Sequence, residues 1–361
     1  MIPFGMEYWY IIMPILGILY AFIQMSKNNN QLLSGSKWPI VSLVLTVYVI
    51  FYIGNRPLWA YADTVMYVHA FNGFLSGSFE KVSINESEWA WQTIADFCKA
   101  TTDAHGYLFT IATIYIGSMA AAAWLFMRRH YGMAIAFLFT SFSFFSYGTN
   151  GLRQGAGASI VILALAVLAM KNHRNIFLGV IGLLLIYIAT SIHASLYLSL
   201  LVAAICLWKC DGRLAIKIWI GCVFVSLFIP TNSITILTNL IQDNRITSYQ
   251  QSAVTLDTFS RTGWRWDFIL YSGIAVLFGW YTIVKKGMTD YKYNVLFTFY
   301  TLTNAAWVLI NPIAYSNRFA YISWSIYPLI MAYPLATFPI FKRQGLATGL
   351  ILIAWITFTC I

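Results

Sequence analysis

The sequence predicts an all-α polytopic membrane protein. Hydrophobic residues make up 60% of its 361 residues and charged residues only 9%. Most apolar residues fall into runs of about 20, the length at which an α-helix crosses a hydrocarbon core of roughly 30 Å. The runs are unbroken, whereas strands of a membrane β-barrel alternate apolar and polar residues. Because a backbone in lipid must satisfy its own hydrogen bonds, each run is expected to be a helix.

One integral membrane domain, residues 1–361, with about 12 transmembrane helices is therefore expected. The predicted spans are 9–25, 38–54, 106–127, 131–147, 152–170, 175–191, 194–209, 214–230, 266–284, 293–311, 318–338 and 345–361. The runs that meet at Arg153 and at His193 are short, so one of each pair is alternatively a re-entrant segment. The first run lacks a basic leader and indicates an ordinary span rather than a cleaved signal peptide.

Basic residues set the expected orientation. Lysine and arginine concentrate in one set of short alternating loops, such as those at Lys27, Arg128 and Lys285. The positive-inside rule places these loops in the cytoplasm. The net charge of +10 then reflects topology and does not indicate nucleic-acid binding.

Two long loops, 55–105 and 231–265, lie on the opposite, outward face of this topology. Within the first, ESEWAWQTIADFCK at 86–99 predicts a short amphipathic helix at the membrane interface. Its charged side chains, including Glu88, are expected to face water. The outward face carries most of the polar chain, so we expect the functional site there.

An arginine opens one of the central spans. Arg153 lies in NGLRQGAGAS, residues 150–159, at the outward end of its span. A charge at the membrane centre costs about 2.5–3.5 kcal/mol on insertion scales, so such a residue needs a cavity, a partner or a helix end. One interpretation is a snorkelling arginine beside a face of small residues that packs closely on a neighbour. The other is an anion site, since guanidinium groups bind phosphate oxygens bidentately.

Three further arginines are expected at the same depth. Arg318 lies in YSNRFAY, residues 315–321, and Arg261 and Arg265 lie in FSRTGWRWDF, residues 259–268. Together with Arg153 they predict a cationic, aromatic-lined pocket at the outer leaflet. Lipid-linked pyrophosphates hold their anions at that depth.

Two other stretches carry candidate proton acceptors. His193 in SIHAS, residues 191–195, has an ordinary pKa near 6.5, but a lone histidine is equally able to hydrogen-bond a neighbour in a turn. Asp63 in WAYADTVMY, residues 59–67, shares a helical face with Tyr67 four residues later. Its carboxylate either binds a sugar hydroxyl or acts as a base, or it caps a helix.

Taken in order, DTVMY, NGLRQGAGAS, SIHAS and SNRFAYISW resemble the EpsG family of bacterial membrane proteins. That family is related to the Wzy polymerases of O-antigen and capsule synthesis. The resemblance implies a glycosyltransferase-C-like helical architecture and the joining of glycan repeat units on undecaprenyl pyrophosphate at the outer face of the inner membrane. At matching positions, Arg153 and Arg318 correspond to the family's arginines, His193 to its histidine and Asp63 to its early aspartate.

The function expected from the sequence is therefore a membrane exopolysaccharide or O-antigen polymerase that faces the periplasm or exterior. The four arginines stabilise the departing pyrophosphate. His193, slightly preferred, or Asp63 removes the acceptor proton. The side chains expected to bind substrate are Tyr67, Gln154, Asn317 and Tyr321. Expected partners are an undecaprenyl-pyrophosphate-linked oligosaccharide and membrane lipid, with a chain-length regulator considered as a further one; no metal, cofactor or nucleic acid is expected.

Two rival functions use similar chemistry. A flippase or transporter for lipid-linked oligosaccharides would also need a cationic cavity, but it would open that cavity to both faces and carry polar groups along its spans. An O-antigen ligase uses the same donor with a different acceptor, and the sequence does not separate it from a polymerase.

Overall fold

A computed structural model of the chain describes residues 6–26, 39–73, 88–170, 176–229, 264–312 and 316–360, without the side chains of residues 6–8, 317, 318 and 360. Throughout these ranges the regular structure is helical and no β-strand occurs. The predicted all-α class is therefore confirmed. Parts of both predicted outer loops, 74–87 and 230–263, lie outside the described residues, and so does Arg261.

The first part of the chain forms helices that follow the predicted spans closely. They are α1 (Met6–Met25), α2 (Pro39–Gly54), α3 (Ala62–Phe71), α4 (Trp89–Thr101), α5 (Ala104–Met127), η3 (Arg128–His130), α6 (Tyr131–Phe139), α7 (Phe142–Thr149), α8 (Leu152–Ala169), and α9 (Ile176–Thr190). The second part comprises η4 (Ala194–Leu196), α10 (Tyr197–Trp208), α11 (Gly212–Ser226), α14 (Trp266–Trp280), the π-helical η6 (Tyr281–Lys285), α15 (Tyr291–Ile310), α16 (Asn317–Trp324), α17 (Tyr327–Thr337) and α18 (Gln344–Cys360).

The predicted span 131–147 is two helices, α6 and α7, that meet at Thr140 and Ser141. Both hydroxyls turn back onto their own chain: Thr140 donates to the Ala136 carbonyl at 2.6 Å and Ser141 to the Leu138 carbonyl at 2.8 Å. The Thr140 carbonyl in turn accepts from Thr359 on α18 at 2.5 Å. The Thr359 hydroxyl thus pairs a carbonyl at the break, and the Thr140 and Ser141 hydroxyls are themselves bonded within their own turn.

The predicted span 318–338 is likewise divided, into α16 and α17, at Ser325 and Ile326. The Ser325 hydroxyl donates to the Ile322 carbonyl at 2.9 Å, as the serine of the first break does. Helices of this kind, with eight to eleven residues, are about 12–17 Å long and do not cross a bilayer singly.

Among the described residues, four helical segments are long and apolar enough to cross a membrane: Ala104–Phe139, Leu152–Ala169, Trp266–Lys285 and Phe319–Thr337. Shorter apolar helices accompany them: Trp9–Met25, Pro39–Gly54, Ile176–Thr190, Ala194–Trp208 and Gln344–Thr359. The protein is therefore a helical membrane protein. The number of about 12 spans and the glycosyltransferase-C-like architecture stay predictions.

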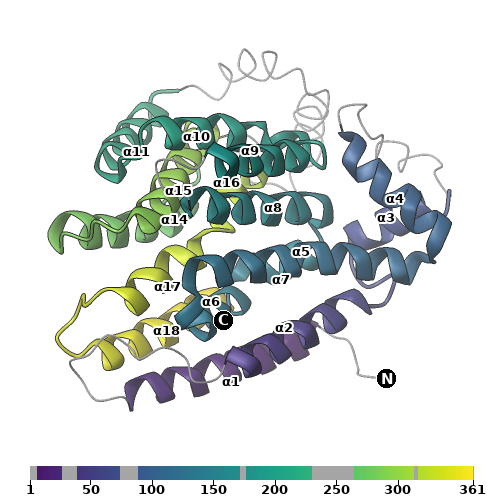
Figure 1. Cartoon of the computed structure of the whole chain (residues 1–361), viewed down its shortest axis with the longest axis horizontal. Helices are drawn as coiled ribbons and strands as arrows, with labels where there is room; N and C mark the ends of the chain where they lie inside the picture. The colour runs from purple at the N-terminus through teal and green to yellow at the C-terminus, as the bar shows by residue number, and fades with distance from the viewer. Residues whose placement is uncertain are drawn as a thin grey trace.

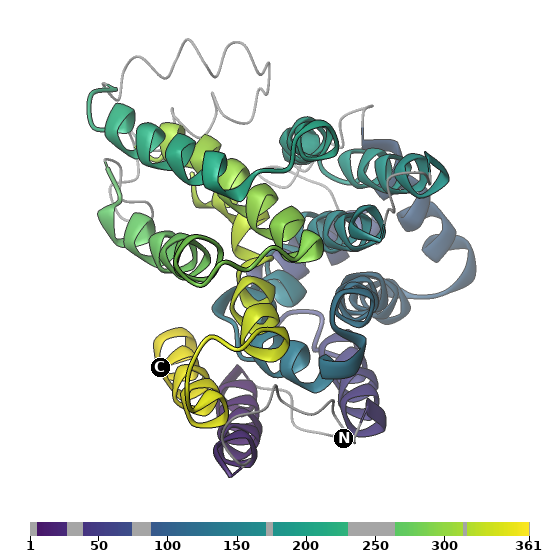
Figure 2. The same ribbon diagram turned by 60° about the vertical axis from the view of Figure 1, so that its left-hand side comes forward.

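The helices pack as a bundle with α5, α8, α15 and α17 in its interior (Figure 1). Helices α1 and α18 lie side by side at one flank, against α6, and α9, α10, α11 and α14 cover the opposite side (Figures 1 and 2). The outer helices expose many large apolar side chains, such as Phe22, Ile176 and Leu277. Such surfaces suit contact with lipid tails.

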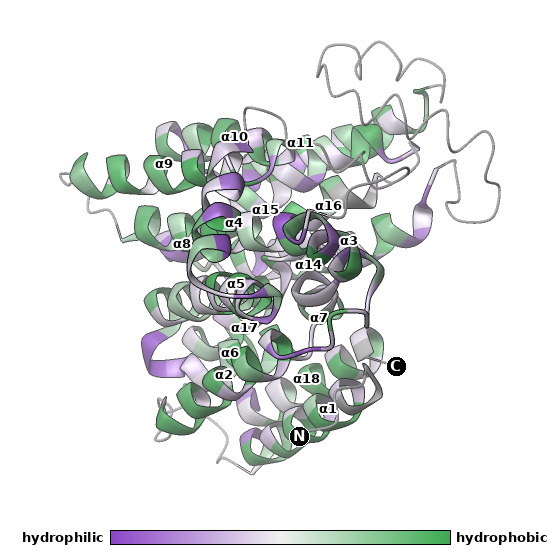
Figure 3. Cartoon of the chain, turned by 90° about the vertical axis from the view of Figure 1, so that its right-hand side faces the viewer, coloured by the Kyte–Doolittle hydropathy of each residue, from purple (hydrophilic) through white to green (hydrophobic). Residues whose placement is uncertain are grey.

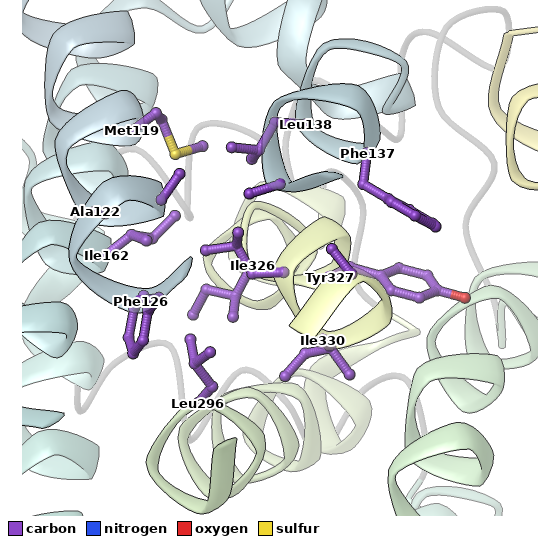
Figure 4. Close-up of a cluster of buried hydrophobic side chains, with 14 of the residues drawn as sticks. Met119, Ala122, Phe126, Phe137, Leu138, Ile162, Leu296, Ile326, Tyr327 and Ile330 are labelled. Carbon is purple, nitrogen blue, oxygen red and sulfur yellow. The ribbon is translucent and has the colours of Figure 1, made fainter. Parts of the chain in front are cut away.

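The centre of the bundle is an apolar cluster around the start of α17. Ile326 lies among Met119 and Ala122 of α5, Leu138 of α6 and Ile162 of α8 (Figure 4). Every residue of α17 from Tyr327 to Ala336 is buried. The break before α17 therefore lies at the centre of the packing.

Buried polar side chains are bonded across helices in this bundle. The Asn304 amide on α15 accepts from Trp219 Nε1 of α11 at 2.8 Å, and donates to Ser272 of α14 at 3.0 Å and Ser323 of α16 at 2.9 Å. One fully buried amide thus ties four helices together.

Candidate functional site

Five of the predicted site residues gather at one end of the bundle, which carries α3 and α4: Asp63, Tyr67, Arg153, Gln154 and His193. The end of α2, the α7–α8 turn and the α9–η4 turn also lie there, as the hydrogen bonds below show. Figure 3 looks onto this end: α3 and α4 include hydrophilic segments, whereas the long helices are mainly hydrophobic. We refer to it as the α3–α4 end.

Arg153 in the first turn of α8 is held by an ion pair. Its Nη1 donates to Glu88 Oε2 at 2.7 Å, and both side chains are almost closed to solvent, with 7% of Arg153 and 0% of Glu88 exposed. The other carboxylate oxygen, Oε1, accepts from the backbone N–H of Ala194 at 3.1 Å. Glu88 therefore joins the NGLRQGAGAS turn to the SIHAS turn.

Glu88 was expected to face water, and this prediction is wrong. The amphipathic helix itself is present as α4, with Trp89 and Phe97 exposed as large apolar side chains. Glu88 immediately precedes it, and the amides of Ala90 and Trp91 donate to the Ser191 carbonyl at 3.1 and 3.4 Å. The start of α4 is thus fixed on the end of α9, which turns Glu88 inward.

The DTVMY stretch forms α3, as the four-residue spacing of Asp63 and Tyr67 predicted. Tyr67 interacts with the Arg153 guanidinium and packs edge to face on Trp91, with ring centroids 5.4 Å apart. One turn earlier, the Thr64 hydroxyl donates to the Thr149 carbonyl at 2.7 Å. Helix α3 is therefore attached to both sides of the α7–α8 turn, with Asp63 half-buried beside it.

His193 caps the short helix η4. Its Nδ1 accepts from the Ser195 backbone N–H at 3.2 Å and lies 2.8 Å from the Ser195 hydroxyl. Because a backbone N–H only donates, Nδ1 is the unprotonated nitrogen, and a neutral ring carries its proton on Nε2. The imidazole then presents a donor at Nε2 rather than a proton acceptor.

Small residues let the α7–α8 turn close tightly. A Cβ on Gly155 would lie 2.8 Å from the Tyr147 carbonyl oxygen and 2.9 Å from the Tyr147 Cβ. Gly157 faces Leu196 and the Ala189 carbonyl in the same way. The glycines of GAGAS therefore bring α8 against α7 on one side and the SIHAS turn on the other.

An aromatic row links this turn to the second group of arginines. Tyr147 meets Tyr321 edge to face at 4.6 Å, Tyr321 meets Trp324 at 5.5 Å, and Trp324 meets Phe268 at 5.0 Å. Tyr321 belongs to SNRFAY, and α16, which carries Arg318, begins one turn before Tyr321. The side chains of Asn317 and Arg318 are outside the described residues.

Arg265 is bound by its own helix. Its Nε and Nη2 donate to the two oxygens of Asp267 at 2.9 and 2.6 Å, and its guanidinium lies 3.9 Å from the centre of the Phe268 ring. The Arg265 backbone exchanges hydrogen bonds with the Asn311 side chain at 3.3 and 3.4 Å. Arg265 is therefore close to the segment that leads to α16, and its charge is compensated by Asp267.

The EpsG family model matches residues 39–361, nearly all of the helical bundle. The chain belongs to the EpsG family. This confirms the resemblance that the four stretches indicated, and it supports a polysaccharide polymerase-type function in a membrane. Searches of curated proteins and of solved structures gave no match.

In this EpsG-family chain the structure also shows a cation that the sequence analysis passed over. Arg56 follows α2 and is completely buried. Its Nε donates to Thr64 Oγ1 at 2.9 Å and its Nη1 to the Ile53 carbonyl at 2.8 Å, and within the described part of the chain Nη2 has no hydrogen-bond partner. Burial lowers the pKa of this guanidinium to about 9, so it is still charged at neutral pH.

Four stretches of the EpsG-family sequence thus meet at the α3–α4 end, through Tyr67, Arg153, Ala194 and Tyr321. Gln154 is buried beside Arg153 in α8. A single pocket of four arginines stays a prediction, because Arg261 and the Arg318 side chain lie outside the described residues. In the described ranges, no three His, Cys, Asp or Glu side chains are grouped as a metal site would require.

Proposed function

We propose that this EpsG-family protein is a membrane glycan polymerase that transfers a glycan from a lipid pyrophosphate to a lipid-linked repeat unit at the outer face of the cytoplasmic membrane. One observation carries the proposal beyond family membership. Glu88 bonds Arg153 of one stretch and Ala194 of another, while Tyr67 of a third interacts with the same guanidinium. Residues distant in sequence are thus held together by polar contacts at this end of the bundle.

In the proposed reaction, a hydroxyl of the acceptor sugar attacks the anomeric carbon of the donor. A new C–O bond forms as the bond between that carbon and the pyrophosphate oxygen breaks. The bonding electrons leave with the lipid pyrophosphate, and the acceptor proton passes to a base. Cationic groups fixed where the negative charge appears stabilise this transition state, because they need not reorganise during the reaction.

Arg153 is the proposed pyrophosphate-binding residue at the α3–α4 end. Its charge is shared with Glu88, but its Nε has no hydrogen-bond partner in the described chain. The ion pair fixes the guanidinium in place, and the buried Nε–H is proposed to bind the anion once the covering side chains part. Arg318, Arg265 and Arg261 are proposed to complete the anion site from the other side of the aromatic row, with Asn317, Gln154 and Tyr321 as substrate-binding neighbours.

Asp63 is the proposed general base. His193 was slightly preferred from the sequence, but its Nδ1 accepts from Ser195, so its neutral ring offers a donor to substrate. The Asp63 carboxylate lies on α3, one residue from Thr64 and on the same helical face as Tyr67. His193 is then proposed to donate a hydrogen bond to the glycan.

The test is reconstitution of the purified protein in vesicles with a synthetic lipid-pyrophosphate repeat unit, with product length measured on a gel. Wild type is expected to give a ladder of polymer. Arg153→Met alone leaves Glu88 as a buried charge without its partner, which could unfold the protein. It is therefore compared with the double variant Arg153→Met, Glu88→Gln, in which both positions are neutral. The proposal expects no polymer from either, whereas full-length polymer from the double variant would reject Arg153 as the anion-binding residue.

The same assay separates the rival functions. A ligase would transfer one glycan to a distinct acceptor and yield no ladder. A flippase would move the lipid-linked unit across the vesicle membrane without lengthening it, which a protected-label assay detects. Either product pattern from wild type would replace the polymerase proposal.

A further inference from the structure

Arg56 is unusual among the described cations because it is buried without a carboxylate. Arg153 and Arg265 each pair with an acid, at 2.7 and 2.6 Å, whereas no ion pair of Arg56 occurs within the described ranges. Its exposed fraction is 0%. Removing a charge from water costs several kcal/mol unless it is compensated. A neutral donor such as glutamine would fill a purely structural role with a smaller desolvation cost.

The side chain is anchored so that its Nη2 amino group has no hydrogen-bond partner within the described residues. Nε is bonded to Thr64 and Nη1 to the Ile53 carbonyl, which fixes the plane of the guanidinium. Nη2 is buried and has no partner in the part of the chain that the structure describes. Buried polar atoms without partners are rare in folded proteins, and each one calls for an explanation, such as a catalytic role or a bound water or ion.

Arg56 and Arg153 contact the same face of α3. Arg56 bonds Thr64, and Arg153 interacts with Tyr67, three residues further along the helix. Residues three apart on a helix are neighbours, with about 5–6 Å between their Cβ atoms. The Thr64 hydroxyl also donates to the Thr149 carbonyl, four residues before Arg153. The two guanidinium groups are therefore joined through α3, where their partners Thr64 and Tyr67 lie one helical turn apart, and each has one buried nitrogen without a hydrogen-bond partner in the described chain, Nη2 of Arg56 and Nε of Arg153.

We propose that Arg56 is a second phosphate-binding residue, which donates from Nη2 to the diphosphate group of a polyprenyl-linked substrate while Arg153 donates from Nε. A diphosphate carries two phosphoryl groups, and each of them is able to accept from a guanidinium group. Because Arg56 is covered in the unliganded chain, its neighbours must part for the anion to enter. The inference rests on the proposed function for the class of substrate, but not on sugar transfer itself.

The test measures binding of geranylgeranyl pyrophosphate and, separately, of geranylgeraniol to the full chain in lipid nanodiscs. The ratio of the two affinities reports recognition of the diphosphate. Arg56→Met is expected to lower this ratio about tenfold or more, since it removes a charge-assisted hydrogen bond, and to leave alcohol binding unchanged. Lys99→Met, which removes an exposed charge from α4 at the same end, is expected to keep the wild-type ratio.

Thr64→Val separates a structural role from a binding role. It removes the hydrogen bond to Nε but keeps the guanidinium, so it is expected to retain most of the wild-type ratio. If Thr64→Val loses as much as Arg56→Met, or if Arg56→Met keeps the wild-type ratio, Arg56 is structural and the inference is wrong. If Arg56→Met does not fold, hydrogen exchange of wild type over residues 54–68 decides: protection by the pyrophosphate but not by the alcohol supports the inference, and equal protection overturns it.

Failure of this inference is distinct from failure of the proposed function. Diphosphate binding that depends on Arg56, with no glycan lengthening on reconstitution, rejects the polymerase and leaves the binding site. Polymer formation with an unaltered affinity ratio in Arg56→Met rejects only Arg56. A wild type that does not distinguish the pyrophosphate from the alcohol overturns the role of Arg56.

Discussion

Glu88 and Arg153 form a 2.7 Å ion pair across 65 residues of sequence, and Glu88 simultaneously accepts the Ala194 N–H. Both members of the pair are buried. If one is removed, the other remains a buried charge whose desolvation cost is no longer compensated. The stability of the α3–α4 end should therefore respond strongly to loss of either residue.

Glu88→Ala is expected to lower the free energy of unfolding by about 3–5 kcal/mol, the usual cost of leaving one partner of a buried pair. Chemical denaturation in detergent micelles measures it. Asp96→Ala on the same helix is the control, because Asp96 is exposed and bonds only Gln92 in the described contacts, at 2.7 Å. Asp96→Ala should change the free energy of unfolding by no more than about 0.5 kcal/mol. Equal stability of the two variants would show that the ion pair contributes nothing.

Gly155→Ala is expected to separate α7 from α8. The added Cβ would lie 2.8 Å from the Tyr147 carbonyl oxygen, and backbone yields less readily than a side chain. Overpacking of this kind costs about 1–3 kcal/mol, and glycan transfer should fall because Arg153 is in the same helical turn. At Gly117 on α5 a Cβ meets nothing within 4 Å, so Gly117→Ala should be neutral or stabilising by up to about 1 kcal/mol. The prediction fails if both alanines behave alike.

His193→Asn tests the assigned roles at the SIHAS turn. Asparagine keeps an oxygen that accepts from the Ser195 N–H, so the cap on η4 is retained. Transfer is expected to fall less than about tenfold, whereas Asp63→Asn should lose about 10²–10⁴ as a missing general base does. Initial rates with the synthetic repeat unit measure both. A well-folded His193→Asn variant as slow as Asp63→Asn would return the base role to His193.

Asn304→Ala is expected to loosen four helices at once. It leaves the Trp219 indole N–H without its acceptor and removes one donor from the Ser272 and Ser323 hydroxyls, which keep their bonds to Trp324 and Ala320. Each buried polar group left unsatisfied costs about 1–3 kcal/mol, so the melting temperature should drop clearly. Asn55→Ala, which removes an exposed amide bonded to the Phe51 carbonyl of its own helix, is the control. Matching melting curves would contradict a stabilising role for Asn304.

The helices themselves were predictable from local patterns, because long apolar runs in lipid leave the backbone few alternatives to a helix. The breaks between α6 and α7 and between α16 and α17 were not predictable in this way. Thr140 and Ser141 lie within a run that stays apolar on both sides, and the Thr359 hydroxyl that pairs the Thr140 carbonyl comes from a helix 219 residues away. Hydropathy alone therefore merges each pair of short helices into one span.

The site was predictable in part. Arg153, His193 and Tyr67 were identified from short stretches, and the structure brings them to one end. Glu88 was misplaced, because local amphipathicity assigns a charged residue to water, whereas its partner is far away in sequence. Arg56 was passed over since a basic residue after an apolar run is commonplace, and its burial depends on the packing of α3.

The pairing of α1 with α18 bears on how the protein is made. A Cβ on Gly17 would meet Ile356 at 2.6 Å, and one on Gly349 would lie 2.7 Å from the Ala21 carbonyl oxygen, so the two helices are in close contact along their length. During synthesis α1 enters the membrane long before α18 leaves the ribosome. Until α18 is inserted, the Gly17 face of α1 contacts lipid or the insertion machinery. During the same interval, the Thr140 carbonyl does not have its hydrogen bond from Thr359. A defect in α18 is then expected to reduce the yield of correctly inserted protein more than it lowers the stability of the finished bundle.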